Sequence, residues 1–254
     1  MAEGECRKGL ARRGKRGISR EMTKTALILA PHPDDESIIG LLPLRLRQEC
    51  GFTVWVAPVT LGSRVERRAE RKKELKAACA VLGFRLRFLK PGSPGAELRK
   101  LLASIRPSVV FLPHAKDGHP AHRATHRWAL AALDAARRST FHVVETEYWH
   151  PLEKPNLMVS GGRPALATLR RALACHKGEL ARNDYAARLP AWMIDNVRRG
   201  AELVGGKGAP APDFAYATLY RARRRAAGAW RAEFRGGRIV RSVADMENLA
   251  ARWA

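Results

Sequence analysis

The residues best suited to chemistry in this sequence follow a short apolar run near its N-terminal end. Residues 26–30 are apolar throughout, and His32, Asp34, Asp35 and Glu36 come soon after them. Carboxylates gathered at the end of a buried strand are costly unless a positive charge lies among them. A metal ion is one such charge, since imidazole and carboxylate groups are good ligands for zinc and related cations. The alternative is that Asp34 or Asp35 only caps a helix that begins near Glu36.

A second polar group follows another apolar run, residues 108–112. His119 and His122 lie three positions apart at the expected start of a helix, so both side chains can face one cleft. A catalytic zinc site uses three protein ligands and keeps one position open, whereas a structural site is closed by four. His32, one of the two aspartates that follow it and one of these later histidines would supply three. The two groups together therefore indicate a catalytic metal site.

Alternating strands and helices are expected to bring these two groups together. The hydrophobic pattern predicts strands at residues 25–30, 53–59, 85–89, 108–112, 141–147 and 214–220. It predicts helices at residues 36–50, 64–82, 96–105, 122–137, 164–176 and 181–203. This alternation is typical of an α/β fold with a mostly parallel sheet and helices on both faces. In such sheets ligands bind at the carboxyl ends of the strands, where both polar groups are placed.

Composition divides the chain into a central domain and two basic flanks. Residues 1–23 are polar and basic without periodicity, and we expect a flexible tail there. Residues 24–221 carry the strand and helix pattern, and residues 222–254 are interpreted as a basic C-terminal extension. No apolar run reaches the roughly 18 residues of a membrane span, and the N-terminal residues lack the apolar region of a secretory signal. The four cysteines form no C-x-x-C pair, which favours reduced thiols in a cytoplasmic protein.

The formal net charge of +23 is the unusual feature of the composition. It is compatible with binding of nucleic acid, of an anionic membrane surface or of an anionic substrate. It is also compatible with solvated basic faces in an arginine-rich chain, because the charge is spread over the tail, the helix at 64–82 and the C-terminal region. No recognised nucleic-acid-binding motif accompanies the charge, so no specific nucleic acid is expected.

The two motifs together resemble those of a known enzyme family. Pro31-His32-Pro33-Asp34-Asp35-Glu36 and Asp117-Gly118-His119-Pro120-Ala121-His122 are similar to the paired motifs of the PIG-L/LmbE family of zinc-dependent N-deacetylases. That family includes N-acetylglucosaminyl-phosphatidylinositol deacetylase and the deacetylases of mycothiol and bacillithiol synthesis. The resemblance extends over about residues 25–220 through Arg71, Glu74, Leu82-Gly83 and Tyr216-Ala217.

The resemblance implies a Rossmann-like three-layer α/β fold and a role for each motif residue. His32, Asp35 and His122 would bind zinc, or another divalent metal such as iron. Asp34 would be the general base for a zinc-activated water, and His119 would stabilise the oxyanion or protonate the leaving amine. No G-x-G-x-x-G motif is present, so no dinucleotide cofactor is expected.

Departures from the family pattern concern the substrate more than the metal. Ala121 stands where many relatives have an aspartate, and Asp117 stands where the thiol-pathway deacetylases have a tyrosine. The stretch that ends the strand at 141–147 is expected to line the substrate cleft. The expected substrate-binding residues are Glu36, Arg71, Asp117, Glu147 and His150.

The resemblance therefore predicts an enzyme that removes acetate from an N-acetylglucosaminyl-type conjugate. The substrate would be a small or lipid-linked amino sugar, and the basic surface suits an anionic one. The expected location is the cytoplasm, with peripheral contact at the inner membrane face. Two alternatives stay open: the same zinc site acting on another N-acyl amide, and a basic nucleic-acid-binding protein on the same scaffold. The sequence indicates no oligomeric state.

Overall fold

The computed structural model describes residues 24–90, 92–136, 140–148 and 150–253, so the expected tail at 1–23 lies outside the described residues. Its strands are β1 Thr25–Ala30, β2 Thr53–Pro58, β3 Arg85–Leu86, β4 Val109–Pro113, β5 Thr140–Thr146, β6 Leu157–Gly161, β7 Tyr216–Ala226, β8 Ala229–Ala232 and β9 Arg238–Val240. Its α-helices are α1 Asp35–Ile38, α2 Leu41–Cys50, α3 Arg68–Leu82, α4 Pro94–Ile105, α5 Pro120–Asp134, α6 Arg163–Leu173, α7 Lys177–Leu180, α8 Tyr185–Leu203 and α9 Val243–Ala251. A 3-10 turn at Val65–Arg67 precedes α3.

The strands form one mixed sheet in the order β3-β2-β1-β4-β5-β7-β6-β9, with β8 paired to β7. The strands from β3 to β5 are all parallel, whereas β7 runs antiparallel to β5, β6 and β8. β1 lies between β2 and β4, with Ile28 paired to Val56 on one side and to Phe111 on the other. The polar loops that follow β1 and β4 are therefore neighbours at one edge of the sheet, as the sequence predicts.

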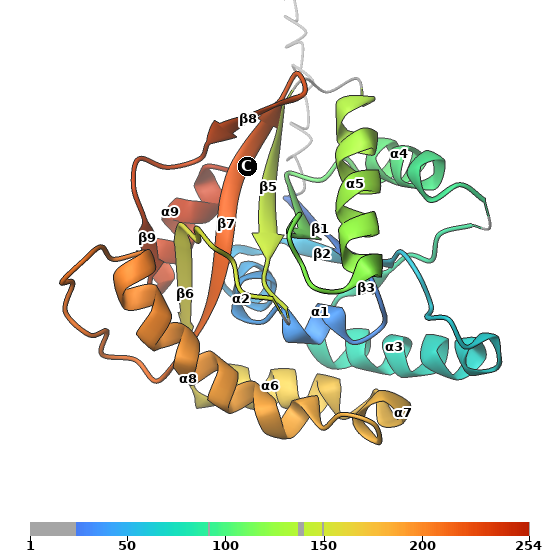
Figure 1. Cartoon of the computed structure of the whole chain (residues 1–254), viewed down its shortest axis with the longest axis horizontal. Helices are drawn as coiled ribbons and strands as arrows, with labels where there is room; N and C mark the ends of the chain where they lie inside the picture. The colour runs from blue at the N-terminus through green and yellow to red at the C-terminus, as the bar shows by residue number, and fades with distance from the viewer. Residues whose placement is uncertain (1–23, 91, 137–139, 149, 254) are drawn as a thin grey trace, which may run out of the picture.

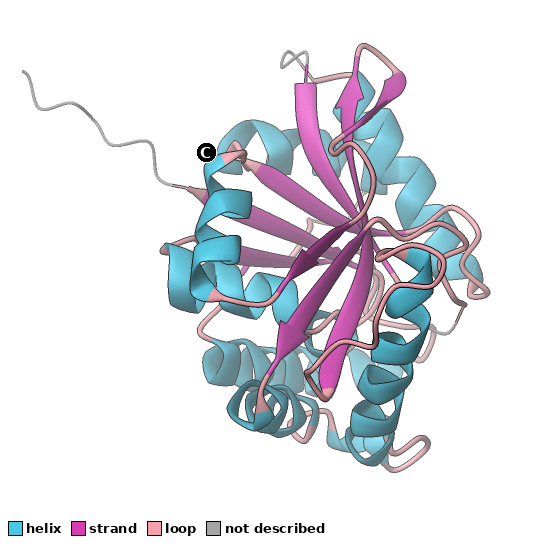
Figure 2. Ribbon diagram, turned by 90° about the vertical axis from the view of Figure 1, so that its left-hand side faces the viewer, coloured by secondary structure: helices cyan, strands magenta, loops and turns pink. Residues whose placement is uncertain are grey.

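Helices cover both faces of this sheet, so the predicted three-layer α/β architecture is confirmed (Figures 1 and 2). Alternate residues of β1 explain why, because Ala26 and Ile28 pack into one core and Leu27 and Leu29 into the other. Apolar residues of α2, α3, α6 and α9 fill the first core, and those of α4 and α5 fill the second. A parallel strand buried on both faces is apolar throughout, which is why β1 was recognisable in the sequence.

The single helix expected at residues 36–50 is two helices in the structure. Gly40 separates α1 from α2 with a φ of +78°, a conformation that L side chains rarely adopt. A Cβ atom at this position would lie 2.3 Å from Thr218 Cγ2 on β7. The backbone N–H of Leu42, just after the break, donates to the hydroxyl of Tyr220 at 3.1 Å. The break therefore fixes α1, which carries Asp35, against the central sheet.

The C-terminal part of the chain belongs to the same sheet, which continues past the domain boundary expected at residue 221. β7 runs through that position to Ala226, and its residues 220–226 pair with β5. β9 extends the sheet beyond β6, and α9 packs Met246 and Leu249 into the first core. Trp253 is 1% exposed. Arginines are frequent at residues 221–225 of β7, so this part of the strand lacks the apolar pattern by which a strand is recognised in a sequence.

In the part of the chain that the structure describes, no helix has the length and apolar character needed to cross a membrane.

Candidate metal centre and catalytic cleft

The turn after β1 holds Asp34 in an unusual backbone conformation. Its φ is +114°, which is costly for a residue other than glycine and is found where neighbouring groups impose it. Glu36 imposes it here, because its Oε2 accepts the Asp34 backbone N–H at 2.9 Å. The other oxygen of Glu36 accepts from the Ser37 hydroxyl at 2.7 Å and from His176 Nε2 at 2.9 Å. A buried network thus aims the Asp34 side chain.

His32, Asp35 and His122 converge from the loops after β1 and β4. Asp35 Oδ2 lies 3.5 Å from His32 Nδ1 and 3.6 Å from His122 Nε2. Two ligand atoms on a tetrahedral zinc ion, at zinc–nitrogen and zinc–oxygen distances near 2.1 Å, are about 3.4 Å apart. The separations in this chain are therefore those of a ligand set around one small cation.

The ring of His122 has a defined tautomer because of Asp117. A carboxylate can only accept, so His122 Nδ1 carries a proton and donates it to Asp117 Oδ2 at 3.0 Å. The lone pair of the neutral ring is then on Nε2, the atom that faces Asp35. Burial opposes a charged His122, but the carboxylates of Asp35 and Asp117 outweigh it and raise the pKa of this imidazole. An imidazole held by a carboxylate in this way is the usual metal-ligating arrangement.

His119 has the opposite tautomer. Its Nδ1 accepts the backbone N–H of Ala121 at 3.2 Å, as the N-cap of α5, so the proton of the neutral ring is on Nε2. Burial, together with the neighbouring imidazoles of His32 and His122, lowers the pKa of His119. Its ring centroid lies 4.8 Å from that of His32. His119 is therefore a neutral hydrogen-bond donor beside the cluster.

Two ligand sets are compatible with these positions. Nitrogen atoms of His32, His119 and His122 all lie within 4.8 Å of one another and could hold a metal as three imidazoles. The alternative set replaces His119 with Asp35. Asp35 is favoured by its charge: burial opposes ionisation of its carboxyl, but His122 and His32 outweigh burial and lower the pKa of that carboxyl. His119 is disfavoured because its Nε2 is protonated.

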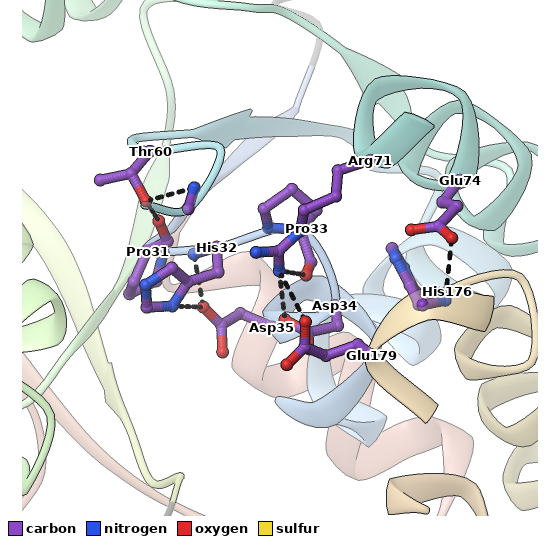
Figure 3. Close-up of polar contacts among 12 residues, drawn as sticks. Pro31, His32, Pro33, Asp34, Asp35, Thr60, Arg71, Glu74, His176 and Glu179 are labelled. Atoms are coloured by element: carbon purple, nitrogen blue, oxygen red, sulfur yellow. Dashed lines mark hydrogen bonds and ion pairs between the residues drawn. The ribbon is translucent and has the colours of Figure 1, made fainter. Parts of the chain in front are cut away.

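Asp34 has the electrostatic surroundings of an acid–base group. Burial, followed by the charges of Asp35 and Glu36, raises the pKa of Asp34 well above its ordinary value, and Arg71 partly opposes them. The guanidinium of Arg71 lies 4.0 Å from Asp34 Oδ1 and 3.7 Å from Glu179 Oε2, and it donates to the Pro33 carbonyl at 2.9 Å (Figure 3). A carboxyl group with a raised pKa can both accept and return a proton near neutral pH.

A cleft of about 570 Å³ opens over these side chains. Its walls include the metal-cluster residues, Arg71 and a polar rim formed by Thr60, Ser63, Arg68, Arg182 and Asn183. Arg71 is thus the one expected substrate-binding residue that lines the cleft.

The other four expected substrate contacts lie elsewhere. Glu36 is 1% exposed, and its two carboxylate oxygens accept hydrogen bonds from the Asp34 N–H and from His176. Asp117 is also 1% exposed, and it accepts from the His119 N–H and from the His122 ring. Both carboxylates therefore position other residues of the site. Glu147 is paired with Arg199 and lines a neighbouring cavity. His150 stacks on His114 at a centroid distance of 5.9 Å and does not line the cleft.

Sequence reasoning missed the contribution of the segment from α7 to the start of α8. Glu179, Arg182, Asn183 and Tyr185 line the cleft, and His176 supports Glu36 from beneath it. This segment carries no motif and lies far from the metal-binding loops in the chain. Residues 181–184 were expected to be helical but precede α8, and the high density of polar residues in this segment was the only available signal.

The chain is similar to proteins of one family over its N-terminal half. The family model described as PIG-L, GlcNAc-PI de-N-acetylase, matches residues 27–133. A probable N-acetyl-alpha-D-glucosaminyl L-malate deacetylase 2 from Bacillus anthracis is 30% identical over 155 residues, which cover 50% of this chain and 68% of the relative. The residues that the family model matches contain both motifs of the candidate metal centre.

Solved structures share the fold. The N,N'-diacetylchitobiose deacetylase of Pyrococcus horikoshii superposes with a TM-score of 0.59 at 18% identity, covering 79% of this chain and 84% of that one. GalB, the 4-carboxy-2-hydroxymuconate hydratase of Pseudomonas putida, gives 0.61 at 17% identity, covering 79% of this chain and 96% of that one. Deacetylation and hydration thus occur on the same scaffold, and the fold alone does not determine the reaction.

Proposed function

Because this chain belongs to the PIG-L family, we propose that it is a metal-dependent N-deacetylase acting on an N-acetylglucosamine-type substrate. The observation that carries the proposal is the convergence of His32, Asp35 and His122 from two distant loops, with Asp34 beside them. This combination of ligands and a separate carboxylate suits hydrolysis of an amide.

Zinc is the metal that the donor set fits best. His32, Asp35 and His122 would hold it, since two imidazoles and one carboxylate are common ligands of catalytic zinc. When bound, a divalent metal polarises the amide carbonyl and lowers the pKa of a water from about 15.7 toward about 7. Two features support this assignment: the His122 tautomer with its lone pair on Nε2, which Asp117 fixes, and the ionised carboxyl of Asp35. Iron, which also accepts imidazole and carboxylate ligands, is the alternative metal.

Asp34 is proposed as the general base. Its carboxyl takes a proton from the attacking water and later returns one to the leaving amine. The raised pKa supports both halves of this role, and the bond from its N–H to Glu36 keeps the side chain in one orientation. Arg71, close to Asp34 and on the cleft wall, favours the ionised form that accepts the first proton.

His119 is proposed to stabilise the oxyanion that develops on the amide carbonyl. Its Nε2–H is available because Nδ1 already accepts from Ala121. Its lowered pKa keeps it neutral, so it donates a hydrogen bond without adding a positive charge beside the metal. One well-placed donor of this kind contributes about 3 kcal/mol to transition-state stabilisation.

The polar rim of the cleft supports an amino-sugar substrate. The hydroxyl group of Ser63 and the amide of Asn183 offer hydrogen bonds of the kind that sugars form. The guanidinium groups of Arg68 and Arg182 would suit a carboxylate or phosphate attached to the sugar.

The test is release of acetate from a panel of N-acetylglucosaminyl conjugates by the zinc-loaded protein. We expect turnover that a chelator abolishes and zinc restores. The Asp34→Ala variant should lose about 10²–10⁴-fold in kcat while retaining its zinc, because the base is not a ligand. Asp213→Ala removes an exposed carboxylate and serves as the matched control. Wild-type turnover in Asp34→Ala, or no acetate from any conjugate, would contradict the proposal.

A further inference from the structure

An apolar chamber of about 250 Å³ lies next to the catalytic cleft. Its apolar walls are formed by Ile38, Tyr148, Pro151, Tyr185, Leu189 and Trp192. Ile38 and Tyr185 also line the cleft, so the two cavities meet at these side chains. Tyr148 contacts the metal cluster from this chamber, because its ring centroid lies 4.6 Å from that of His122.

The charged side chains around this chamber do not require a polar ligand. Glu147 Oε2 accepts from Arg199 at 3.0 Å and from the Leu152 N–H at 2.8 Å. Asp195 pairs with Arg198 at 2.9 Å on the solvent side. Among the described residues that line the chamber, Arg188 alone is charged and in no ion pair, and it is exposed at the mouth. The interior is therefore suited to an apolar group.

The order of the strands places this chamber and the part of the polar rim formed by Thr60 and Ser63 on opposite sides of the metal centre. The ligand loops follow β1 and β4, which are adjacent in the sheet. The polar rim draws Thr60 and Ser63 from the loop after β2, on one side of this pair. The chamber draws Tyr148 and Pro151 from the chain after β5, on the other side, and residues of α8 complete its lining.

An amide bound with its carbonyl at the metal centre has its two substituents on opposite sides of that carbonyl. With the sugar on the side of the rim formed by Thr60 and Ser63, the acyl carbon chain extends toward Tyr148 and the chamber. We infer that the chamber binds the acyl substituent, and that this chain hydrolyses amides with a longer apolar acyl chain in preference to acetyl amides. The inference rests on the proposed function and names its acyl specificity.

The size of the chamber sets the expected chain length. A cavity of about 150 Å³ lined by apolar side chains holds benzene. The larger chamber in this chain therefore has room for about six to eight carbons, many more than the methyl group of acetate. Each buried methylene contributes about 0.8 kcal/mol, which corresponds to about threefold to fourfold in kcat/KM.

The first experiment compares N-acetyl-, N-butanoyl- and N-hexanoyl-glucosamine as substrates of the zinc-loaded protein. We expect kcat/KM to rise along the series, by at least about tenfold from acetyl to hexanoyl. Trp192→Ala removes an aromatic wall and Leu189→Phe fills the chamber, so both should bring the hexanoyl-to-acetyl ratio toward one. Ile194→Ala is the matched control, since Ile194 lies on the same helix but is 53% exposed and outside the chamber. Acetyl turnover without a hexanoyl preference would overturn the inference and leave the proposed function standing.

The second experiment needs no turnover. Calorimetric titration of the metal-free protein with N-hexanoyl- and N-acetyl-glucosamine should give at least about a tenfold lower Kd for the hexanoyl compound. Leu189→Phe should remove this difference and Ile194→Ala should keep it. Equal Kd values for the two compounds would overturn the acyl-chamber assignment, whatever the activity of the loaded enzyme.

Discussion

Substitution of Asp117 by asparagine tests how the metal centre is built. Asp117 Oδ2 accepts from His122 Nδ1 at 3.0 Å, and its Oδ1 accepts from the His119 backbone N–H at 2.7 Å. Asparagine keeps the shape and the Oδ1 acceptor but turns an N–H donor toward His122. The ring of His122 must then carry its proton on Nε2, the atom that faces Asp35. The lone pair needed for a metal is lost without any change in packing.

The expected magnitude follows from the burial of this contact. Asp117 is 1% exposed and His122 2% exposed, so water cannot replace the hydrogen bond. Loss of such a supporting carboxylate weakens metal binding by about 10- to 100-fold, or about 1.4 to 2.7 kcal/mol. Turnover at saturating metal should fall less than metal affinity, because Asp34 and His119 do not depend on the tautomer of His122.

Metal affinity is measured by competition with a chromophoric chelator at fixed pH. The matched control is Glu153→Gln, which replaces the carboxylate by an amide at an exposed residue paired with Lys116. We expect wild-type affinity for the control and the loss above for Asp117→Asn. If folded Asp117→Asn protein bound zinc as tightly as the wild type, the assignment of the His122 tautomer would be refuted.

The same titration repeated over pH gives a second check. The charges of Asp35 and Asp117 raise the pKa of His122 in the metal-free protein despite its burial. Metal must displace that proton, so affinity should fall as the pH drops below this raised pKa. In Asp117→Asn one of the two charges is gone, and the fall should begin at lower pH. An unchanged pH dependence would contradict the role of Asp117.

Three further predictions concern other residues of the site. His122→Ala should lose bound zinc in elemental analysis, and a normal zinc content would remove His122 from the ligand set. Asp34→Asn should raise the Tm of the metal-free protein at neutral pH. Burial, Asp35 and Glu36 raise the pKa of Asp34, so the stability of the wild type falls as the pH rises from 3.8 through that raised pKa. The gain in Tm should therefore vanish in acid, and equal Tm values at neutral pH would refute the prediction. His176→Leu removes the hydrogen bond to Glu36 that supports the Asp34 turn. The value of kcat should then fall about tenfold, equivalent to about 1.4 kcal/mol, while zinc is retained. An unchanged kcat in the folded variant would show that Asp34 is positioned without the His176–Glu36 hydrogen bond.

The central half of the fold was predictable because its strands are buried on both faces. β1, β2 and β4 are apolar runs bounded by polar loops, and their pattern depends on no distant residue. β6 was missed because Leu157–Gly161 is a five-residue strand directly after a proline-rich turn. The break at Gly40 was missed because its cause is Thr218, a contact that sequence spacing does not reveal.

The site was predictable in its residues but not in their directions. The paired motifs identified His32, Asp34, Asp35, His119 and His122, and the structure brings all five together. Whether a carboxylate faces the cleft or supports another side chain depends on backbone geometry. Glu36 and Asp117 were therefore expected in the cleft, although both are buried beneath it.

The most direct test of this account is the ligand set of the zinc-loaded protein, read by X-ray absorption spectroscopy on the wild type and on His119→Gln. We expect zinc with the imidazoles of His32 and His122 and the carboxylate of Asp35, so the imidazole count should be the same in both proteins. An imidazole count that falls in His119→Gln would mean that His119 binds the metal. That result would contradict both the tautomer assigned to His119 and its proposed role as the oxyanion donor.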